Sequence, residues 1–396
     1  MRMDGYDCLC LLSIHPFVLH NHAQMKFIVT LALFLTTVPL YAQTNAQKYE
    51  SLTPEINNII KKTKAVGVSI AIIENYKVVW AKGFGLKEAG TQDSVTATTL
   101  FQAASMSKPV TAVAVMKKVQ EGKISLSEDV NKQLSSWQLP DNEYTKQSKV
   151  NVKELLSHTG GISGAVFRHY TRKDTLPTIV QALNGQAPAI NEPVRVTWYP
   201  GKYAYSAGGY SILEMLLMDT EKKTYPAIME QTVLAPLQME HSTFDYHLPG
   251  REFASGHLKK NAVIEDKYMI IYPFSFGGLW STPADLARFL AEVQLSLKGE
   301  QGHILDQEHT RLMLTPVTNT SGSQYALGFT IAKRGPVNFF GHDGHNYGYI
   351  SSMLASLEGG YGMVIMTNSE NGWKAVNKIK KLVGRKYWAL GSYHPR

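Results

Sequence analysis

Strand-forming segments near both ends of the chain, separated by a long helical region, constrain this sequence more than any other feature. Residues 66–73 form a β-branched run, and residues 77–84 form a second one after a short turn, which predicts a hairpin. Strand signals return towards the other end, at residues 325–332, 337–340, 349–355 and 362–367. We therefore predict an α/β (α+β) fold with one antiparallel sheet built from both chain ends, about residues 43–100 and 320–396.

Helical patterns fill the region between these ends, about residues 101–319. The predicted helices cover residues 105–121, 151–156, 206–220 and 282–297. A last helix, at residues 373–388, is amphipathic and rich in lysine. Packing of its apolar side on the sheet is the favoured interpretation, and binding to a membrane surface is the alternative.

The first 42 residues read as a targeting segment. Met25-Lys26 precedes an apolar run at residues 27–40, which ends before Tyr41-Ala42, as in a secretory signal. A buried helix or a membrane anchor is the alternative, although the run is short for a bilayer span. We expect residues 1–24 to be an upstream extension, residues 25–42 a cleaved signal, and residues 43–396 a periplasmic or secreted hydrolase domain without a stable membrane anchor.

Cysteine content and charge exclude several functions. The only two cysteines, Cys8 and Cys10, precede Met25, so the exported chain would contain neither a disulfide nor a thiol nucleophile. The net charge of +8 comes from scattered basic residues, which favours solubility and mild attraction to anionic surfaces. Because the sequence has neither a basic stripe nor a nucleic-acid-binding motif, we expect no nucleic-acid partner.

Ser105 and Lys108 form the first candidate catalytic pair. They stand three residues apart at the start of a predicted helix, so they share one face of it. A serine hydroxyl is a poor nucleophile until a base removes its proton, and a lysine amine with a lowered pKa can serve as that base or activate another one. Alone, this spacing is a weak signal, and an N-capping serine with a solvated lysine would be the favoured interpretation.

Tyr205 is the second candidate, because it immediately precedes a glycine-rich helix start and can project into a cleft. A phenol titrates near about 10, so it needs a cationic neighbour to act as a base at neutral pH. We expect Lys108 to be that neighbour. A buried tyrosine of the core is the alternative.

The third candidate segment is Gly341-His342-Asp343-Gly344-His345, between two predicted strands. Its glycines would let a substrate backbone approach, and the strand would offer a backbone N–H to an oxyanion. The two histidines lack a third ligand at a useful spacing, so a metal site is not favoured.

Taken in this order, the three segments resemble the serine β-lactamase and penicillin-binding-protein superfamily, specifically its class C-like branch of β-lactamases, D-aminopeptidases and family VIII-type esterases. The resemblance extends from about residue 64 to residue 386 and includes the motifs FQAASMSK, LLSHTGGI and GGLWSTPADLARF. It implies a β-lactamase/transpeptidase-like fold. It also implies a serine hydrolase that forms an acyl-enzyme and needs no metal or organic cofactor.

The resemblance assigns a role to each candidate residue. Ser105 would be the nucleophile, Lys108 its partner, and Tyr205 the general base. The oxyanion hole would be the backbone N–H groups of Ser105 and His345. His342 and Gly344 match the family's K/H-x-G motif and would bind the substrate. His158, in the HTGG segment, is expected to be structural rather than catalytic.

Two departures from the family pattern affect which substrate is expected. Ala207 stands where the family usually has an asparagine that contacts the substrate amide, and Asp343 replaces a threonine-like residue, adding negative charge near a substrate carboxylate. Both weaken the prediction of a β-lactamase. Three hypotheses therefore remain: a hydrolase of esters, amides or small peptides; a β-lactamase or D-Ala-D-Ala carboxypeptidase acting on a β-lactam or a cell-wall peptide; and a penicillin-binding sensor that does not turn over.

Overall fold

The computed structural model describes residues 47–163, 169–248, 250–300, 302 and 304–388, within which Tyr49 onwards forms one compact unit. The predicted signal at residues 25–42, the upstream residues 1–24 and both cysteines lie outside the described residues. None of the helices in the described ranges has both the length and the apolar character needed to span a bilayer.

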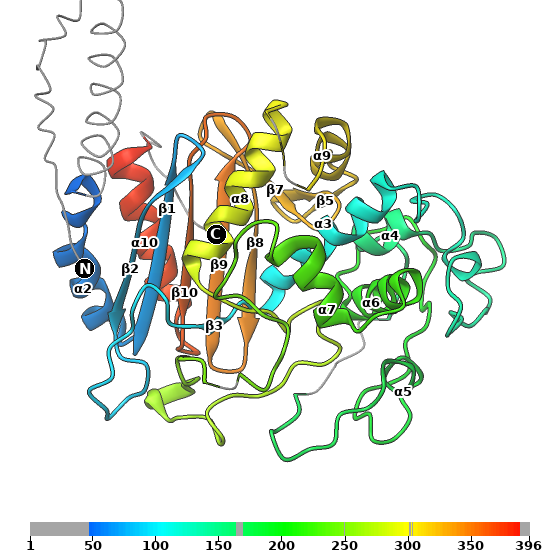
Figure 1. The fold of residues 1–396 in the computed structure, drawn as a ribbon, viewed down its shortest axis with the longest axis horizontal. Coiled ribbons are helices and arrows are strands. Elements are labelled where there is room, and N and C mark those ends of the chain that lie inside the picture. The colour runs from blue at the N-terminus through cyan, green and yellow to red at the C-terminus, as the bar shows by residue number, and fades with distance from the viewer. Residues whose placement is uncertain (1–46, 164–168, 249, 301, 303, 389–396) are drawn as a thin grey trace, which may run out of the picture. The chain divides into compact units, whose positions relative to one another are not determined.

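An eight-stranded antiparallel sheet forms the centre of this unit (Figure 1). Its order is β2-β1-β10-β9-β8-β7-β6-β5, so the first strands of the chain pair with the last one. The prediction of one sheet built from both chain ends is therefore confirmed. The bounds are β1 Gly67–Glu74, β2 Lys77–Gly85, β5 Thr318–Thr320, β6 Ser323–Tyr325, β7 Thr330–Arg334, β8 Val337–Asn346, β9 Tyr349–Ser356 and β10 Gly362–Thr367.

Two predicted strands differ from the observed structure. The strand expected at residues 337–340 continues to Asn346 as β8, so the motif at residues 341–345 lies within a strand and not between two strands. Residues 325–332 do not form one strand, because β6 ends at Tyr325 and β7 begins at Thr330. Gly328 lies between them with a φ of +89°, a left-handed conformation that a continuous strand cannot contain. A separate two-stranded sheet pairs β3 (Phe101–Gln102) with β4 (Trp280–Ser281).

Helices cover both faces of the large sheet (Figure 1). Helices α2 (Thr53–Thr63) and α10 (Trp373–Tyr387) pack on one face, where Ile70, Ile365 and Ile379 are fully buried together. Helices α3 (Ser107–Gln120) and α8 (Pro283–Lys298) pack on the other. The apolar side of α10 is thus buried against the sheet, as the favoured interpretation predicts.

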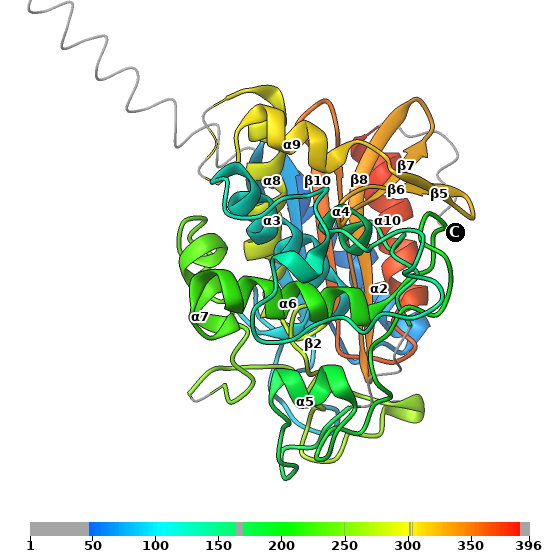
Figure 2. The same ribbon diagram turned by 90° about the vertical axis from the view of Figure 1, so that its right-hand side faces the viewer.

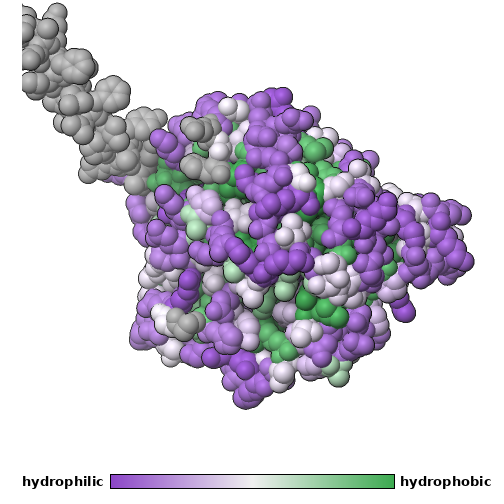
Figure 3. All heavy atoms as spheres, turned by 45° about the vertical axis from the view of Figure 1, so that its right-hand side comes forward, coloured by the Kyte–Doolittle hydropathy of each residue, from purple (hydrophilic) through white to green (hydrophobic). Residues whose placement is uncertain are grey.

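The region between the two ends is helical (Figure 2). It contains α4 (Val152–Leu156), α5 (Ile179–Asn184), α6 (Ala207–Glu221), α7 (Tyr225–Met229) and α9 (Gln307–Leu314), besides α3 and α8. Ser206 caps α6 through a hydrogen bond from Gly209 N, and Thr282 caps α8 through one from Asp285 N. The face seen in Figure 3 is mostly hydrophilic, with apolar side chains gathered in its recesses.

Candidate active site

Ser105 lies on a tight turn that leads into α3. The turn is a short 3-10 helix, Ala104–Met106, and Ala104 has a φ of +52°. A left-handed conformation at a residue other than glycine is uncommon, and such strain is often found at functional sites. This turn therefore holds the Ser105 hydroxyl in a fixed position at the N-terminal end of α3.

Gly344 of β8 lets this turn approach the sheet. A Cβ atom at Gly344 would lie 2.4 Å from the Ala103 carbonyl oxygen and 2.2 Å from Ser351 Oγ. The Ser351 hydroxyl in turn donates a hydrogen bond to that carbonyl, at 2.7 Å. The glycines of this motif are expected from the sequence to allow the approach of a substrate backbone. The structure corrects this expectation for Gly344, because the nucleophile turn of the chain itself occupies the space.

Ser105, Lys108 and Tyr205 meet in the structure. Lys108 Nζ donates a hydrogen bond to Ser105 Oγ at 3.2 Å, and the Tyr205 hydroxyl donates one to the same oxygen at 2.9 Å. Lys108 reaches the serine from the first turn of α3, whereas Tyr205 reaches it from the segment that precedes α6. Two polar groups from two distant segments therefore converge on the hydroxyl oxygen of Ser105.

Lys108 is almost fully buried at this point. Its Nζ also donates to the Phe276 carbonyl oxygen at 2.8 Å and lies 4.7 Å from the centroid of the Tyr205 ring. No carboxylate is among these contacts. Burial lowers the pKa of Lys108 well below its usual value, because the charged form loses hydration that these contacts replace only in part.

Tyr205 differs from the expectation that a cationic Lys108 would lower its pKa. The side chain stays 44% exposed on the cleft side, but the protein packed around its hydroxyl raises the pKa above the usual value. Burial therefore favours the uncharged form of both groups, the amine of Lys108 and the phenol of Tyr205. This pair can still accept one proton, and the buried Lys108 amine is the stronger base of the two.

His342 is held by two hydrogen bonds. Its Nδ1–H donates to the Asp343 carbonyl oxygen at 2.6 Å, and its Nε2 accepts from the Tyr325 hydroxyl at 3.1 Å. Burial lowers the pKa of His342 to about 4, so the ring is neutral at pH 7. Sequence reasoning missed Tyr325, because nothing in the local pattern around this strand end pairs it with residue 342.

Asp343 and His345 point away from His342, as alternation along a strand requires. Asp343 accepts hydrogen bonds from Lys380 Nζ, at 3.0 Å, and from the Ser352 hydroxyl. Its negative charge is therefore balanced by Lys380 of α10, which corrects the expectation of uncompensated charge near a substrate carboxylate. The His345 ring contacts Glu370 at 2.7 Å.

The two expected oxyanion donors belong to neighbouring backbone segments, since the turn that holds Ser105 packs on β8 one residue before His345. Ala207 lies in the first turn of α6, two residues after Tyr205, and contributes no polar side chain.

Across the residues described above, no cluster of three or more histidine, cysteine, aspartate or glutamate side chains could hold a metal ion.

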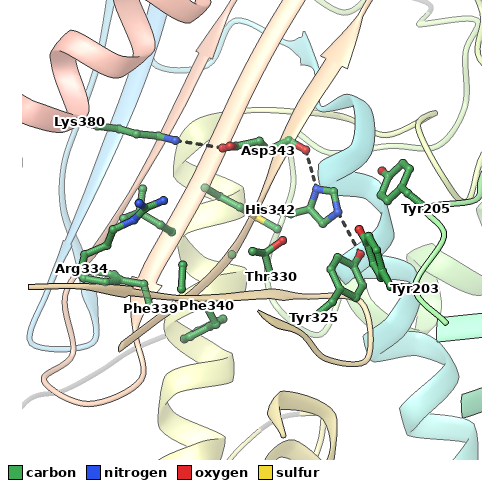
Figure 4. Close-up of a pocket in the computed structure, with 14 residues that line it drawn as sticks. Tyr203, Tyr205, Tyr325, Thr330, Arg334, Phe339, Phe340, His342, Asp343 and Lys380 are labelled. Atoms are coloured by element: carbon green, nitrogen blue, oxygen red, sulfur yellow. Dashed lines mark hydrogen bonds and ion pairs between the residues drawn. The ribbon is translucent and has the colours of Figure 1, made fainter. Parts of the chain in front are cut away.

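A pocket of about 190 Å³ opens beside these residues (Figure 4). Tyr205 and His342 line the end nearest to Ser105, and Arg334, Asp343 and Lys380 line the other end. The remaining lining residues are Tyr203, Tyr325, Thr330, Ala332, Phe339, Phe340, Gly341, Met353 and Leu354. The pocket can hold a small substrate with an apolar body and one polar or charged end.

Comparison with known proteins gives matches over most of the chain. A family model described as Beta-lactamase matches residues 55–383. Protein flp of Staphylococcus aureus (strain MW2) is 26% identical over 322 residues, which cover 79% of this chain and 61% of that protein. A beta-lactamase of Providencia stuartii is 26% identical over 302 residues, which cover 74% of this chain and 71% of that one. The chain thus spans about three fifths of the length of the S. aureus relative.

A solved structure has a similar fold. The D-amino acid amidase of Ochrobactrum anthropi SV3, complexed with L-phenylalanine, matches with a TM-score of 0.65 and 22% identity. The match covers 84% of this chain and 99% of the amidase. At this identity the likeness concerns the fold, and the chemistry has to be argued from the residues of this chain.

Proposed function

This chain belongs to the beta-lactamase family of serine hydrolases, and we propose that it hydrolyses a small ester, amide or peptide through an acyl-enzyme on Ser105. One observation carries this proposal: Ser105 Oγ receives hydrogen bonds from both Lys108 Nζ and the Tyr205 hydroxyl. Two titratable groups on one serine oxygen are the arrangement that nucleophilic catalysis requires.

In the first step, Ser105 Oγ attacks the substrate carbonyl carbon. The serine proton passes to the Tyr205–Lys108 pair, which becomes a phenol beside an ammonium group. The negative charge that develops on the carbonyl oxygen is stabilised by the backbone N–H groups of Ser105 and His345. The pair then donates its proton to the leaving oxygen or nitrogen as the carbonyl–leaving group bond breaks.

In the second step, water occupies the space of the leaving group. The Tyr205–Lys108 pair, again neutral, takes a proton from this water as its oxygen attacks the acyl carbon. The ester bond to Ser105 Oγ breaks, and the pair returns the proton to that oxygen. The free serine and a carboxylic acid result, and no other group enters the reaction.

A substrate without a carboxylate fits this site better than a β-lactam, which carries one. His342 is neutral and its Nε2 is occupied by Tyr325, so it offers no positive charge to an anion. Ala207 offers no amide to an acylamino side chain. We therefore propose simple esters and amino-acid amides as the substrate class, the second of these in line with the name of the D-amino acid amidase.

A β-lactamase or D-Ala-D-Ala carboxypeptidase is the second candidate. One observation favours it: Arg334 lines the far end of the pocket, where it could meet a substrate carboxylate. The third hypothesis, a penicillin-binding sensor without turnover, is less favoured, because Ser105, Lys108 and Tyr205 are all present and in contact.

Parallel rate measurements separate the three candidates. A short-chain p-nitrophenyl ester, a D-amino-acid amide and a chromogenic cephalosporin are compared with the purified protein and with Ser105→Ala. We expect turnover of the first two, slower turnover of the cephalosporin, and no turnover by the variant. A single stoichiometric burst on the cephalosporin, with no turnover of any substrate, would establish the sensor instead.

We also propose that the protein is exported from a start at Met25 and that residues 43–396 form the hydrolase domain. The support is the basic start and the apolar run at residues 27–40. Deletion of residues 1–24 should leave export and activity unchanged in a bacterial host. Loss of export in that variant would contradict the proposed start.

A further inference from the structure

His158 lies beside Tyr205 at the end of α4, and its backbone is in an unusual conformation. Its φ is +59°, in the left-handed region. Helices often end on a residue in this conformation, but that residue is usually glycine or asparagine, because other side chains strain the backbone. Histidine adopts this conformation more readily than most residues, so its role has to be judged from the contacts of its side chain.

Two hydrogen bonds connect His158 with the residues on either side of Tyr205. The His158 carbonyl oxygen accepts from Ala204 N at 2.8 Å, and its Nδ1 accepts from Ser206 N at 3.1 Å. The ring itself packs on the Tyr205 ring, with 4.4 Å between centroids. His158 thus holds the backbone before and after the tyrosine and contacts the tyrosine ring.

The surroundings keep the His158 ring neutral. The side chain is 3% exposed and packs near Tyr210 and Tyr325 as well as Tyr205. Burial lowers the pKa of His158 well below its usual value. Nδ1 can accept from Ser206 N only in this neutral form, with the proton on Nε2.

His158 Nε2 has no hydrogen-bond partner within the described ranges. An unsatisfied buried N–H costs free energy, and such a group in a native protein often has a functional explanation. A ring chosen only to fill space would be better served by phenylalanine, which has no polar atom to bury. The Nδ1 acceptor is therefore the feature that distinguishes histidine at this position.

We propose that His158 is a positioning residue, which fixes the Tyr205 hydroxyl on Ser105 Oγ by holding the backbone on both sides of Tyr205. This inference rests on the proposed function, because it concerns the geometry of the Tyr205–Ser105 hydrogen bond. His158 does not touch the reacting atoms and exchanges no proton in the reaction.

Three substitutions test this role. In His158→Asn, Oδ1 takes about the place of Nδ1, and asparagine tolerates the left-handed backbone. In His158→Gln the acceptor lies one bond further out, and His158→Phe keeps a ring without an acceptor. We expect kcat of the Asn variant to stay within about fivefold of wild type, and kcat of the Gln and Phe variants to fall by about 10²-fold, because small misplacements of a catalytic group are costly. KM should change by less than about twofold in all three.

His257 provides the matched control. It is fully buried, and its Nε2 accepts from Ala89 N at 3.0 Å, so it also satisfies a backbone N–H with a ring nitrogen. Its Nδ1 contacts the Asn368 carbonyl oxygen instead of the candidate site. His257→Gln should lower the melting temperature and leave kcat unchanged at temperatures where the protein is folded.

Two readouts are made on every variant: steady-state kinetics on the p-nitrophenyl ester and the rate of fluorophosphonate labelling at Ser105. Wild-type kcat in His158→Gln, or an equal loss of kcat in His257→Gln, would overturn the positioning role. If His158→Phe does not fold, the difference in kcat between His158→Asn and His158→Gln decides whether the Nδ1 acceptor positions Tyr205. Ser105→Ala and Tyr205→Phe are measured alongside, and if they retain full activity, the proposed function itself has failed.

Discussion

Lys380 Nζ lies 3.0 Å from Asp343 Oδ1, so a largely buried lysine of α10 pairs with a carboxylate in the middle of the motif at residues 341–345 of β8. The pair joins the helix on one face of the sheet to the strand that carries His342 and Gly344 on the other. The aspartate that departs from the family pattern therefore has a structural partner 37 residues further along the chain.

Substitution of Lys380 should make the free energy of unfolding less dependent on pH in the acidic range. Desolvation raises the pKa of Asp343, but Lys380 and the Ser352 hydroxyl outweigh it and hold the pKa below the usual value. A lowered folded-state pKa stabilises the protein above the unfolded pKa of about 3.9, and this contribution is lost as the pH falls through the folded value. Since Asp343 is half exposed, Lys380→Met should cost only about 1 kcal/mol at neutral pH.

Urea unfolding at about pH 7 and about pH 3 measures this effect. The difference in unfolding free energy between wild type and Lys380→Met should shrink at the lower pH. Lys378→Met, on the exposed side of the same helix, is the control and should show no such change. A difference of equal size at both pH values would mean that Lys380 contributes through packing rather than charge.

Gly344→Ala should impair catalysis more than stability. The new methyl group would meet the Ala103 carbonyl oxygen and Ser351 Oγ, so the turn that carries Ser105 must shift. We expect kcat/KM on the ester to fall by about 10²-fold, because a displacement of about 1 Å at a catalytic group has this effect. Ester kinetics together with a thermal melt make the measurement.

Gly209→Ala is the control for this prediction. Gly209 lies in α6, where an added Cβ meets the nearest atom at an ordinary 3.5 Å, and alanine favours helix. This variant should keep its activity. Near-normal rates in Gly344→Ala would show that the turn has room to adjust.

The sequence predicted the sheet well, because β-branched runs at 66–84 and 349–367 depend on local pattern alone. It also predicted the Ser105–Lys108 contact, since a spacing of three residues on a helix brings two side chains together.

Tyr205 could be placed beside these two residues only through the family resemblance, because the sequence between residues 108 and 205 gives no local signal of the path of the chain. The contacts of His342 with Tyr325 and of Asp343 with Lys380 depend on strand pairing and on helix docking, which no local pattern reports. Strand alternation did indicate that residues 342 and 343 point to opposite faces, and this signal could have corrected the expectation for Asp343.

Tyr205 and Lys108 should behave as one catalytic unit. Tyr205→Phe removes one oxygen atom and should preserve the fold, while the rate falls by about 10²–10⁴-fold, as expected for a positioned acid–base group. Lys108→Ala should cost a similar factor. The double variant should lose much less than the product of the two, since groups that share one proton are not additive.

The pH profile of kcat/KM provides a second measurement on the same pair. Burial lowers the pKa of Lys108, so the amine stays unprotonated to a lower pH than an ordinary lysine. Activity should therefore rise with pH on a limb that lies well below the pKa of a free lysine, about 10.4, and level off above it. Lys108→Arg, whose side chain stays protonated, should be inactive across the range. Near-normal rates of Tyr205→Phe on every substrate would contradict this mechanism.

Ala207→Asn should shift the substrate preference towards β-lactams. The substitution places a side-chain amide two residues after Tyr205, in the first turn of α6, where the structure has only a methyl group. An acylamino side chain of a β-lactam can bond with this amide, whereas a simple ester has no group to do so. One or two new hydrogen bonds are worth about 1–2 kcal/mol net, so the ratio of kcat/KM for a chromogenic cephalosporin to that for a p-nitrophenyl ester should rise by about 5-fold to 30-fold. Ala207→Ser, which is polar but too short to reach the same group, is the control and should leave the ratio unchanged. If Ala207→Asn also leaves it unchanged, the preference is set elsewhere in the pocket, and the neutral His342 becomes the determinant to vary next.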